Sequence, residues 1–302
     1  MSRPLVSVVI LSYSRPELLR RAIESVADQS YPSLDILVVD NLSQKSEAIA
    51  RIVSTFPRVR FIRNDRNLGF AGGMNVGIAS AAGEYVYLTE DDVSLRPGCL
   101  SSMMTYMERH PDAGLVAPVM YDQSSGSVRS AGGRFALDSI FTLKIITERA
   151  TGQEPLPFDV MYVPGASMLA RASFLKLLKG FREDFFLYQE DLELCIRVLK
   201  SGRRIITVPS AGVDHVDPPG GWASDTIEYF RMRNLFATYM LHAPARVLPS
   251  FVIRYGAIDL PRTIVRNPRR GWLMAKAWLS VAANAPRLMR ERDSRPVQAV
   301  GP

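Results

Sequence analysis

The chain has 302 residues, of which 47% are hydrophobic and 22% charged, an ordinary composition for a globular protein with a sizeable core. Its two cysteines, Cys99 and Cys195, exclude a disulfide framework and favour a reducing, cytoplasmic setting. No apolar run reaches the roughly 18 residues that a membrane span needs, and the apolar start lacks a small-residue cleavage site. We therefore expect neither a signal peptide nor a membrane-spanning helix.

The net charge of +7 is unevenly distributed along the chain. From Trp222 onward there are 13 basic and 5 acidic residues, a balance of +8, which leaves −1 for everything before it. Because nucleic-acid-binding proteins more often carry basic residues on the folded core, among aromatic residues, we expect no nucleic-acid partner. A basic segment interleaved with apolar runs instead favours an anionic membrane surface, and the alternative is a solvated helical appendage.

Strands and helices are predicted to alternate through the first part of the chain. Near-continuous apolar runs predict buried strands at Ser7–Tyr13, Leu34–Asp40, Val59–Asn64 and 84–89. Apolar residues at helical spacing predict three helices. One begins at Pro16, the second ends at about Phe56, and the third runs from the glycine-rich stretch to about Ala82. This alternation indicates an α/β fold with a mostly parallel sheet covered on both faces.

Polar residues gather where these strands end, at Asp40, Asp65 and the acidic run 90–92, and ligands bind at that edge of open α/β sheets. The loop after the first strand has no glycine, which excludes a dinucleotide-binding G-x-G-x-x-G site. There is also no G-x-S-x-G elbow and no zinc-ligand spacing. Three adjacent carboxylates repel one another, and Mg²⁺ or Mn²⁺ shared with substrate phosphates would relieve that repulsion. The alternative is an exposed acidic turn before Pro97.

Five segments in order resemble the family 2 inverting glycosyltransferases, and more narrowly the bacterial rhamnosyltransferases and galactofuranosyltransferases. They are VSVVILSYSRPELLRRAIESVADQSYPSLDILVVDNLS, NLGFAGGMNVGI, YVYLTEDDV, FFLYQEDLELCIRVLKSG and VDH, and the resemblance covers roughly residues 5–240. The resemblance implies a GT-A fold, in which a Rossmann-like nucleotide-binding half and an acceptor half enclose a divalent metal. We therefore expect a catalytic domain at 1–240 and a basic, apolar helical segment at 241–302.

The resemblance also implies a role for individual residues on the nucleotide side. Asp40 would hydrogen-bond the nucleobase, and Asp92 and His215 would contact the metal, with Asp214 and Asp217 holding the histidine ring. Glu90 departs from the usual aspartate, and it would reach ribose or metal. The other expected donor-binding residues are Ser12, Tyr13, Asp65, Asn67, Gly69, Gly72, Gly73, Asn75 and Asp91. The alternative for the glycines is a tight strand-to-helix turn that requires positive φ.

A second acidic pair, Glu190–Asp191, opens an amphipathic helical stretch. Acids in the first turn of a helix complement its dipole, which is the structural alternative. The resemblance instead implies that Asp191 is the catalytic base and that Glu190 orients the acceptor. It also implies that residues 121–160 form a loop or hairpin facing the acceptor, and that 218–224 close over the donor.

We thus expect an inverting, metal-dependent glycosyltransferase that uses dTDP-rhamnose or a UDP-hexose. The acceptor would be a cell-surface polysaccharide or a lipid-linked glycan precursor, handled at the inner face of the cytoplasmic membrane. The alternatives are a soluble enzyme acting on a small metabolite and a non-catalytic sugar-nucleotide-binding module. Three later apolar stretches, broken by Pro244, Pro261, Pro268 and Pro286, would anchor at a membrane interface, dock onto the catalytic domain or form a homo-oligomer contact.

Overall fold

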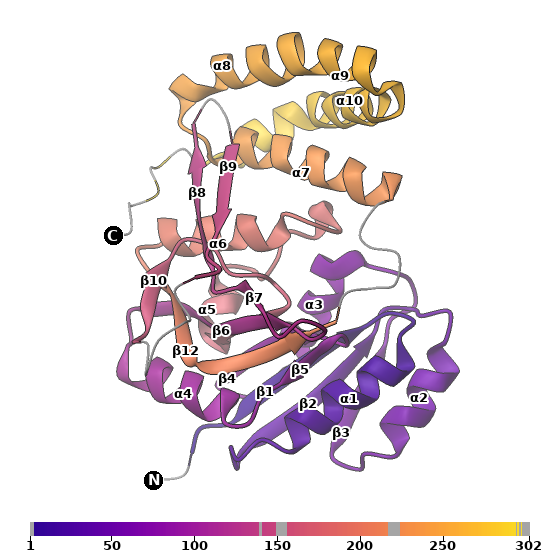
Figure 1. Cartoon of the computed structure of the whole chain (residues 1–302), viewed down its shortest axis with the longest axis vertical. Helices are drawn as coiled ribbons and strands as arrows, with labels where there is room; N and C mark the ends of the chain where they lie inside the picture. The colour runs from indigo at the N-terminus through magenta and orange to yellow at the C-terminus, as the bar shows by residue number, and fades with distance from the viewer. Residues whose placement is uncertain are drawn as a thin grey trace.

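The computed structural model of the protein describes residues 3–138, 141–148, 156–216, 224–293, 295 and 297. Figure 1 shows a sheet flanked by helices in the lower part of the molecule and a stack of helices above it. The expectations for Asp217 and for most of the loop 218–224 lie outside the described residues. Among the described residues, no helix combines the length and the hydropathy that crossing a membrane requires.

The nucleotide-side half of the sheet consists of four parallel strands, as the apolar runs predict. They are β1 (Val6–Ser12), β2 (Leu34–Asp40), β3 (Val59–Arg63) and β4 (Tyr85–Glu90), with β1 between β2 and β4. The predicted helices are confirmed as α1 (Pro16–Ala27), α2 (Ser46–Ser54) and α3 (Gly69–Ser80). Because parallel strands end at one edge, Ser12, Asp40 and Glu90 come to the same side of the sheet.

The other half of the sheet is mixed. The full strand order is β10-β12-β6-β11-β4-β1-β2-β3, in which β11 is antiparallel to β4 and β12 is parallel to β6. Two short strands pair off this path, β5 with β12 and β7 with β6. The bounds are β5 (Val93–Leu95), β6 (Ala113–Asp122), β7 (Val128–Ser130), β10 (Phe158–Val160), β11 (Ser167–Arg171) and β12 (Arg204–His215). The expected α/β architecture with a mostly parallel sheet is thereby confirmed.

Helices cover both faces of this sheet and enclose two apolar cores. One core packs α1, α2 and α4 (Cys99–Arg109) against the sheet, and the other packs α3, α5 (Ala172–Leu177) and α6 (Glu190–Lys200) against the opposite face. A separate hairpin of β8 (Gly133–Leu137) and β9 (Phe141–Ile145) stands between the sheet and the upper helices in Figure 1. This hairpin confirms the structure expected within 121–160.

The C-terminal part is a helical layer with its own apolar core. Its elements are α7 (Asp225–His242), η2 (Ala245–Val247), α8 (Leu248–Val252), the π-helical η3 (Ile253–Asp259), α9 (Leu260–Arg266) and α10 (Pro268–Arg290). The core joins Phe236 and Tyr239 of α7 to Phe251 of α8, Ala277 of α10 and Phe185 of η1 (Glu183–Phe185). The structure thus shows the segment docked onto the rest of the chain, which is one of the alternatives expected for it. The predicted boundary at 240/241 falls inside α7.

The prolines of this layer stand both at helix starts and inside helices. Pro249 and Pro268 stand in the first turn of α8 and α10, where a missing N–H costs nothing. Pro261 lies where η3 passes into α9 within the continuous helical run 248–266, and Pro286 lies inside α10, which continues to Arg290. The prolines that separate the apolar stretches of the sequence therefore do not all end a helix.

Candidate active site

The acidic run after β4 is tied to the loop after β1. The Asp91 carboxylate accepts hydrogen bonds from the Ser12 hydroxyl at 2.8 Å and from the Tyr13 backbone N–H at 2.9 Å. Arg15 forms an ion pair with Asp91 at 2.6 Å and a second one with Asp92. Burial raises the pKa of Asp91 to about 7, although Arg15 opposes this. The expected nucleotide contact of Asp91 stays a prediction, since its carboxylate here shapes the β1 loop.

Asp92 and His215 face each other across two paired strands. The antiparallel pairing of β5 with β12 sets His215 opposite Val93, and the His215 Nε2 lies 3.9 Å from Asp92 Oδ1. That carboxylate oxygen is buried and has no hydrogen-bond partner within the described part of the chain. A carboxylate oxygen and an imidazole nitrogen are both ligands that divalent cations accept. The two residues therefore fit the metal site expected from the sequence.

These two side chains would supply only part of a coordination shell. The described ranges contain no group of three or more His, Cys, Asp or Glu side chains placed to hold a metal ion. A cation held by one or two protein ligands completes its shell with water and substrate phosphates. Glu90 lies nearby and is half-buried. Burial raises its pKa to about 8, Asp92 adds to the rise, and Arg15 opposes it.

Asp40 is buried in the turn that follows β2. Its carboxylate accepts hydrogen bonds from the Ser43 N–H at 2.9 Å and from the Ser46 hydroxyl at 2.6 Å. The neighbouring Asn41, which sequence reasoning missed, joins this turn to the next one. Its amide donates to the Asn67 side chain at 3.0 Å and to the Gly69 carbonyl at 2.9 Å. Asp65 and Asn67 are exposed, so they remain accessible to a nucleotide.

The glycines of α3 bring this helix close to its neighbours. A Cβ on Gly69, where φ is +68°, would lie 2.2 Å from the Phe186 carbonyl oxygen, and one on Gly73 would lie 2.5 Å from a Leu11 methyl. Asn75 is hydrogen-bonded to the backbone N–H of Phe181 at 2.8 Å and to its carbonyl at 2.9 Å. These contacts give the glycines and Asn75 a packing role, and the approach of α3 to a diphosphate stays a prediction.

The second acidic pair begins α6 as predicted. Asp191 accepts hydrogen bonds from the Tyr162 hydroxyl at 2.7 Å, the Gly165 N–H at 3.2 Å and the Leu192 N–H at 2.7 Å. Burial raises the pKa of Asp191, and these three hydrogen bonds oppose the rise. Burial and the adjacent Asp191 hold the pKa of Glu190 well above its usual value, and Glu190 Oε2 has no hydrogen-bond partner within the described ranges. Asp191 is therefore the acid of the pair that ionises more readily.

One cavity of about 390 Å³ gathers much of the predicted chemistry. Glu90, Glu190, Asp191 and His215 all line it. Its other walls come from α3, the hairpin, the segment between β10 and β11, the loop before α6, and α7. The residues that form these walls include Phe70, Leu143, Ile145, Tyr162, Leu187, Tyr188 and Arg231. The predicted residues on the nucleotide side, from Ser12 to Asn67, do not line this cavity and lie at the ends of β1, β2 and β3.

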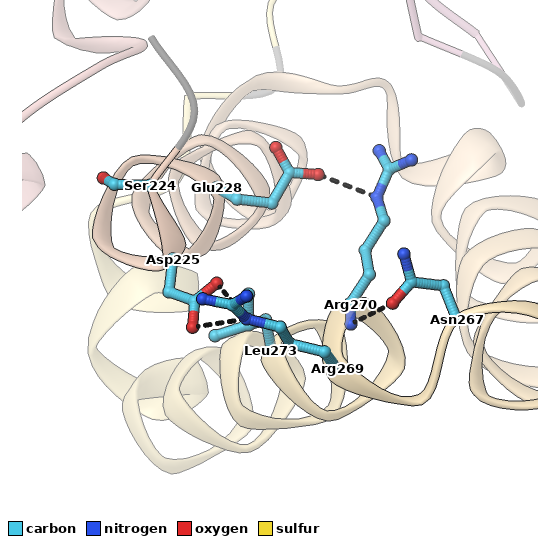
Figure 2. Close-up of a pocket in the computed structure, with 7 residues that line it drawn as sticks. All are labelled: Ser224, Asp225, Glu228, Asn267, Arg269, Arg270 and Leu273. Carbon is cyan, nitrogen blue, oxygen red and sulfur yellow. Dashed lines mark hydrogen bonds and ion pairs between the residues drawn. The ribbon is translucent and has the colours of Figure 1, made fainter. Parts of the chain in front are cut away.

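A second cavity of about 390 Å³ lies between the first turns of α7 and α10 (Figure 2). Two ion pairs span it, Arg269 to Asp225 at 2.8 Å and Arg270 to Glu228 at 2.8 Å. None of its lining residues borders the cavity of the acidic pair. The ion pairs balance the charges of this cavity and join α7 to α10.

The loop that leads into α6 has an uncommon backbone. Phe186, Tyr188 and Gln189 have φ of +63°, +64° and +68°, a region that non-glycine residues rarely occupy. The Asn234 side-chain amide of α7 lies 2.8, 2.9 and 2.7 Å from the carbonyl oxygens of Phe185, Leu187 and Tyr188. Asn234 is fully buried. This contact was not predicted from the sequence. Its one local sign is an asparagine within an apolar helical stretch, and that pattern does not tell which residues the asparagine contacts.

The family model described as Glycosyl transferase family 2 matches residues 7–178, a range that contains β2, β3, β4 and all of β1 except Val6. The chain belongs to glycosyltransferase family 2. It is 30% identical over 230 residues to the N-acetylglucosaminyl-diphospho-decaprenol L-rhamnosyltransferase of Mycobacterium tuberculosis. That alignment covers 69% of this chain and 75% of the relative.

Solved structures show that this glycosyltransferase has the expected GT-A fold. GalNAc-T7 with UDP, GalNAc and Mn²⁺ superposes with a TM-score of 0.69 at 14% identity, covering 95% of this chain and 58% of that one. S. aureus TarS 1-349 in complex with UDP-GlcNAc superposes with a TM-score of 0.63 at 17% identity, covering 95% of this chain and 84% of that one. At these identities the likeness concerns the fold alone.

Proposed function

We propose that this glycosyltransferase moves a sugar, with inversion, from a nucleotide-diphospho-sugar to a cell-surface polysaccharide or lipid-linked glycan precursor. The observation that carries the proposal is the placement of Asp191, Glu190, Glu90 and His215 around one cavity at the carboxyl edge of the sheet. The M. tuberculosis relative is named for an L-rhamnosyl donor and a diphospho-decaprenol acceptor, which favours dTDP-rhamnose, with a UDP-hexose as the other donor. We propose the inner face of the cytoplasmic membrane as the site of transfer.

Asp191 takes the proton of the acceptor hydroxyl as its oxygen attacks the anomeric carbon. The bond from that carbon to the diphosphate oxygen breaks on the opposite face, and the nucleoside diphosphate leaves. A base must be ionised before it reacts, and the hydrogen bonds from Tyr162, Gly165 and Leu192 favour the ionised form of Asp191. Glu190, whose pKa is held higher, keeps its proton and donates a hydrogen bond that orients the acceptor.

Asp92 and His215 are the residues that would hold Mg²⁺ or Mn²⁺. When bound there, the cation neutralises charge that develops on the departing diphosphate. Arg15 balances the negative charge of Asp91 and Asp92 through its two ion pairs. The GalNAc-T7 structure contains Mn²⁺ together with UDP, which supports a divalent cation in this fold.

The test is donor binding and sugar transfer by the full chain and by Asp191→Asn. Calorimetry with a panel of UDP- and dTDP-linked hexoses, with and without Mn²⁺, should find one donor that binds only with the metal. Asp191→Asn should bind that donor as the wild type does and lose about a hundredfold or more in transfer rate, the usual contribution of a catalytic base. Asp112→Asn is the matched control, because Asp112 is exposed and pairs with Arg204 at the surface.

Unchanged transfer by Asp191→Asn would refute the assigned base. Binding of a donor with no transfer by the wild type to any lipid-linked or soluble acceptor would favour the sugar-nucleotide-binding module. Transfer only to a small soluble compound would favour the metabolite-modifying enzyme.

A further inference from the structure

The exposed apolar side chains of the protein are concentrated in its C-terminal helices. Of the eleven large hydrophobic residues that are exposed among the described residues, seven lie between Val252 and Met289, so this layer carries most of them. Val265 is 83% exposed and Ile253 is 57% exposed. Contiguous exposed apolar surface on a soluble protein marks a binding surface.

Four of these side chains, Val252, Ile253, Ile264 and Val265, lie on one helical run, where they form a stripe with three smaller exposed residues. Residues Leu248–Arg266 pass through α8, η3 and α9 without a break. Exposed apolar residues recur along it at every fourth position, at Pro249, Ile253, Ala257, Pro261 and Val265, with Val252 and Ile264 beside them. We call these seven residues the outer stripe. Spacing of this kind places side chains on one face of a helix.

The opposite face of the same run is fully used by the protein's own core. Phe251 stacks on Tyr239 of α7 with ring centroids 3.9 Å apart, and it lies 5.5 Å from the Trp278 ring of α10. Figure 1 shows α8 and α9 as the outermost layer, with α10 and α7 between them and the sheet. The outer stripe belongs to none of the apolar cores that the described residues form. Ile264 at its edge also packs against Gly271 of α10, and the rest of the stripe lies on the outer side of this layer.

Arginines flank the outer stripe. From Arg246 to Arg270 the chain has six arginines and a single acid, Asp259. Asp259 pairs with Arg254 at 3.0 Å, and the ion pairs in Figure 2 engage Arg269 and Arg270. The remaining three, Arg246, Arg262 and Arg266, are exposed and form no ion pair with any described residue. The face thus presents apolar side chains together with uncompensated positive charge.

We propose that the outer stripe docks this protein onto an anionic phospholipid bilayer. An amphipathic helix with arginines beside its apolar face lies in the interface plane, where the apolar side chains enter the acyl boundary and the arginines meet lipid phosphates. A second copy of the chain is a poorer occupant. A twofold contact pairs a surface with itself, so it would bring the three unpaired arginines of each copy together.

The hairpin connects this surface with the cavity of the acidic pair. Leu143 and Ile145 of β9 line the cavity, and the Phe141 N–H at the other end of β9 donates to the Tyr255 hydroxyl of η3 at 3.3 Å. An apolar strand thus leads from the docking helix to Asp191. A lipid-linked acceptor could follow it, and this step alone rests on the proposed function.

The experiment is flotation of the full chain with phosphatidylglycerol-containing vesicles and with pure phosphatidylcholine vesicles. The wild type should bind the anionic vesicles and bind the neutral ones far more weakly, and added salt should weaken binding. Arg262→Gln/Arg266→Gln should lower the partition coefficient about tenfold or more. Ile253→Asp/Val265→Asp should abolish binding, because two charges would enter the apolar boundary.

Two control variants carry equivalent changes elsewhere on the surface. Leu177→Asp alters a side chain that is 76% exposed, and Arg21→Gln/Arg51→Gln removes two exposed arginines from α1 and α2. Both controls should bind anionic vesicles as the wild type does. Equal loss in the control variants would overturn the assigned surface, as would no vesicle binding by the wild type. A concentration-dependent dimer abolished by Ile253→Asp/Val265→Asp would identify a second copy as the occupant.

Donor binding separates the two proposals. The docking variants should bind sugar nucleotide as the wild type does, since they lie outside the active-site cavity. Vesicle binding without any donor binding would refute the proposed function and leave the docking surface intact. Donor binding and transfer without vesicle binding would refute the docking surface and leave the proposed function intact.

Discussion

Replacing Asn234 should have two effects that can be measured separately, one on the stability of the fold and one on the shape of the active-site loop. The two N–H groups of its amide serve three carbonyl oxygens at 2.7–2.9 Å, all in the loop before the acidic pair. Asn234→Ala removes two net hydrogen bonds, worth about 0.5–1.5 kcal/mol each, and takes this donor from the Leu187 and Tyr188 carbonyls, while the Phe185 carbonyl keeps the Leu187 N–H at 2.7 Å. We therefore expect the free energy of unfolding to fall by about 2–4 kcal/mol.

Asn234→Ala should also change the conformation of the loop, and this change should lower the rate of catalysis. Phe186, Tyr188 and Gln189 each have a positive φ, which costs of order 1 kcal/mol for a non-glycine residue. Without Asn234 they can relax toward ordinary backbone angles, which would move Asp191 relative to the donor. We expect kcat to fall by at least tenfold while KM for the donor changes little, because misplacement of a catalytic group by a fraction of an ångström has effects of this size.

Urea unfolding and steady-state kinetics measure the two effects. Asn234→Asp keeps the size of the side chain and lacks the N–H donors, so it should resemble Asn234→Ala. Asn284→Ala is the matched control, because the Asn284 amide donates once, to the Ser280 carbonyl of its own helix at 2.8 Å. It should stay within about 0.5 kcal/mol of the wild type. Equal stability and equal kcat for Asn234→Ala and Asn284→Ala would refute the role given to Asn234.

Three further predictions concern the interior. Burial lowers the pKa of His242 from its usual 6.5 despite the adjacent Glu193, so the unfolded chain takes up a proton before the folded one as the pH falls. The free energy of unfolding should therefore decrease below about pH 6.5. Urea titrations between pH 5 and 8 should show a smaller decrease for His242→Gln than for the wild type. Gly77→Ala should lower the thermal midpoint, because its Cβ would lie 2.2 Å from a Val9 methyl, whereas Gly256→Ala, with its nearest atom 3.9 Å away, should not. Burial raises the pKa of Cys99 to about 12 and that of Cys195 further, so mass spectrometry should find neither thiol alkylated by iodoacetamide until urea unfolds the chain.

The local patterns of the sequence predict most of the nucleotide-binding half. Each of its four strands is an apolar run whose period needs no tertiary information, and their observed bounds lie within a residue of the predicted ones. The acids at 90–92 and 190–191 stand out because carboxylates directly after or before apolar segments are costly to bury. Those patterns therefore indicate both sides of the active site.

Other parts of the site depend on contacts between distant segments. Tyr162 and Asp191 are 29 residues apart and Asn234 is 46 residues from Tyr188, so no local pattern reports either contact. Asn41 lies between two turns that meet only after β2 and β3 pair. The glycines of α3 suggested a phosphate-binding loop, yet Gly73 and Gly77 face Leu11 and Val9 of β1, and this close helix–strand packing satisfies the same pattern.

The contact of Asn234 with the active-site loop limits where this enzyme can be recombined with its relatives. The helical layer supplies hydrogen bonds that shape residues 185–189, and Phe185 in turn fills the core of that layer. A chimera that joins the first 240 residues of this chain to the tail of another glycosyltransferase would cut α7 and expose that core. A crossover that transfers the acceptor preference of one enzyme to another should therefore carry the loop, α7 and the later helices as one inherited block.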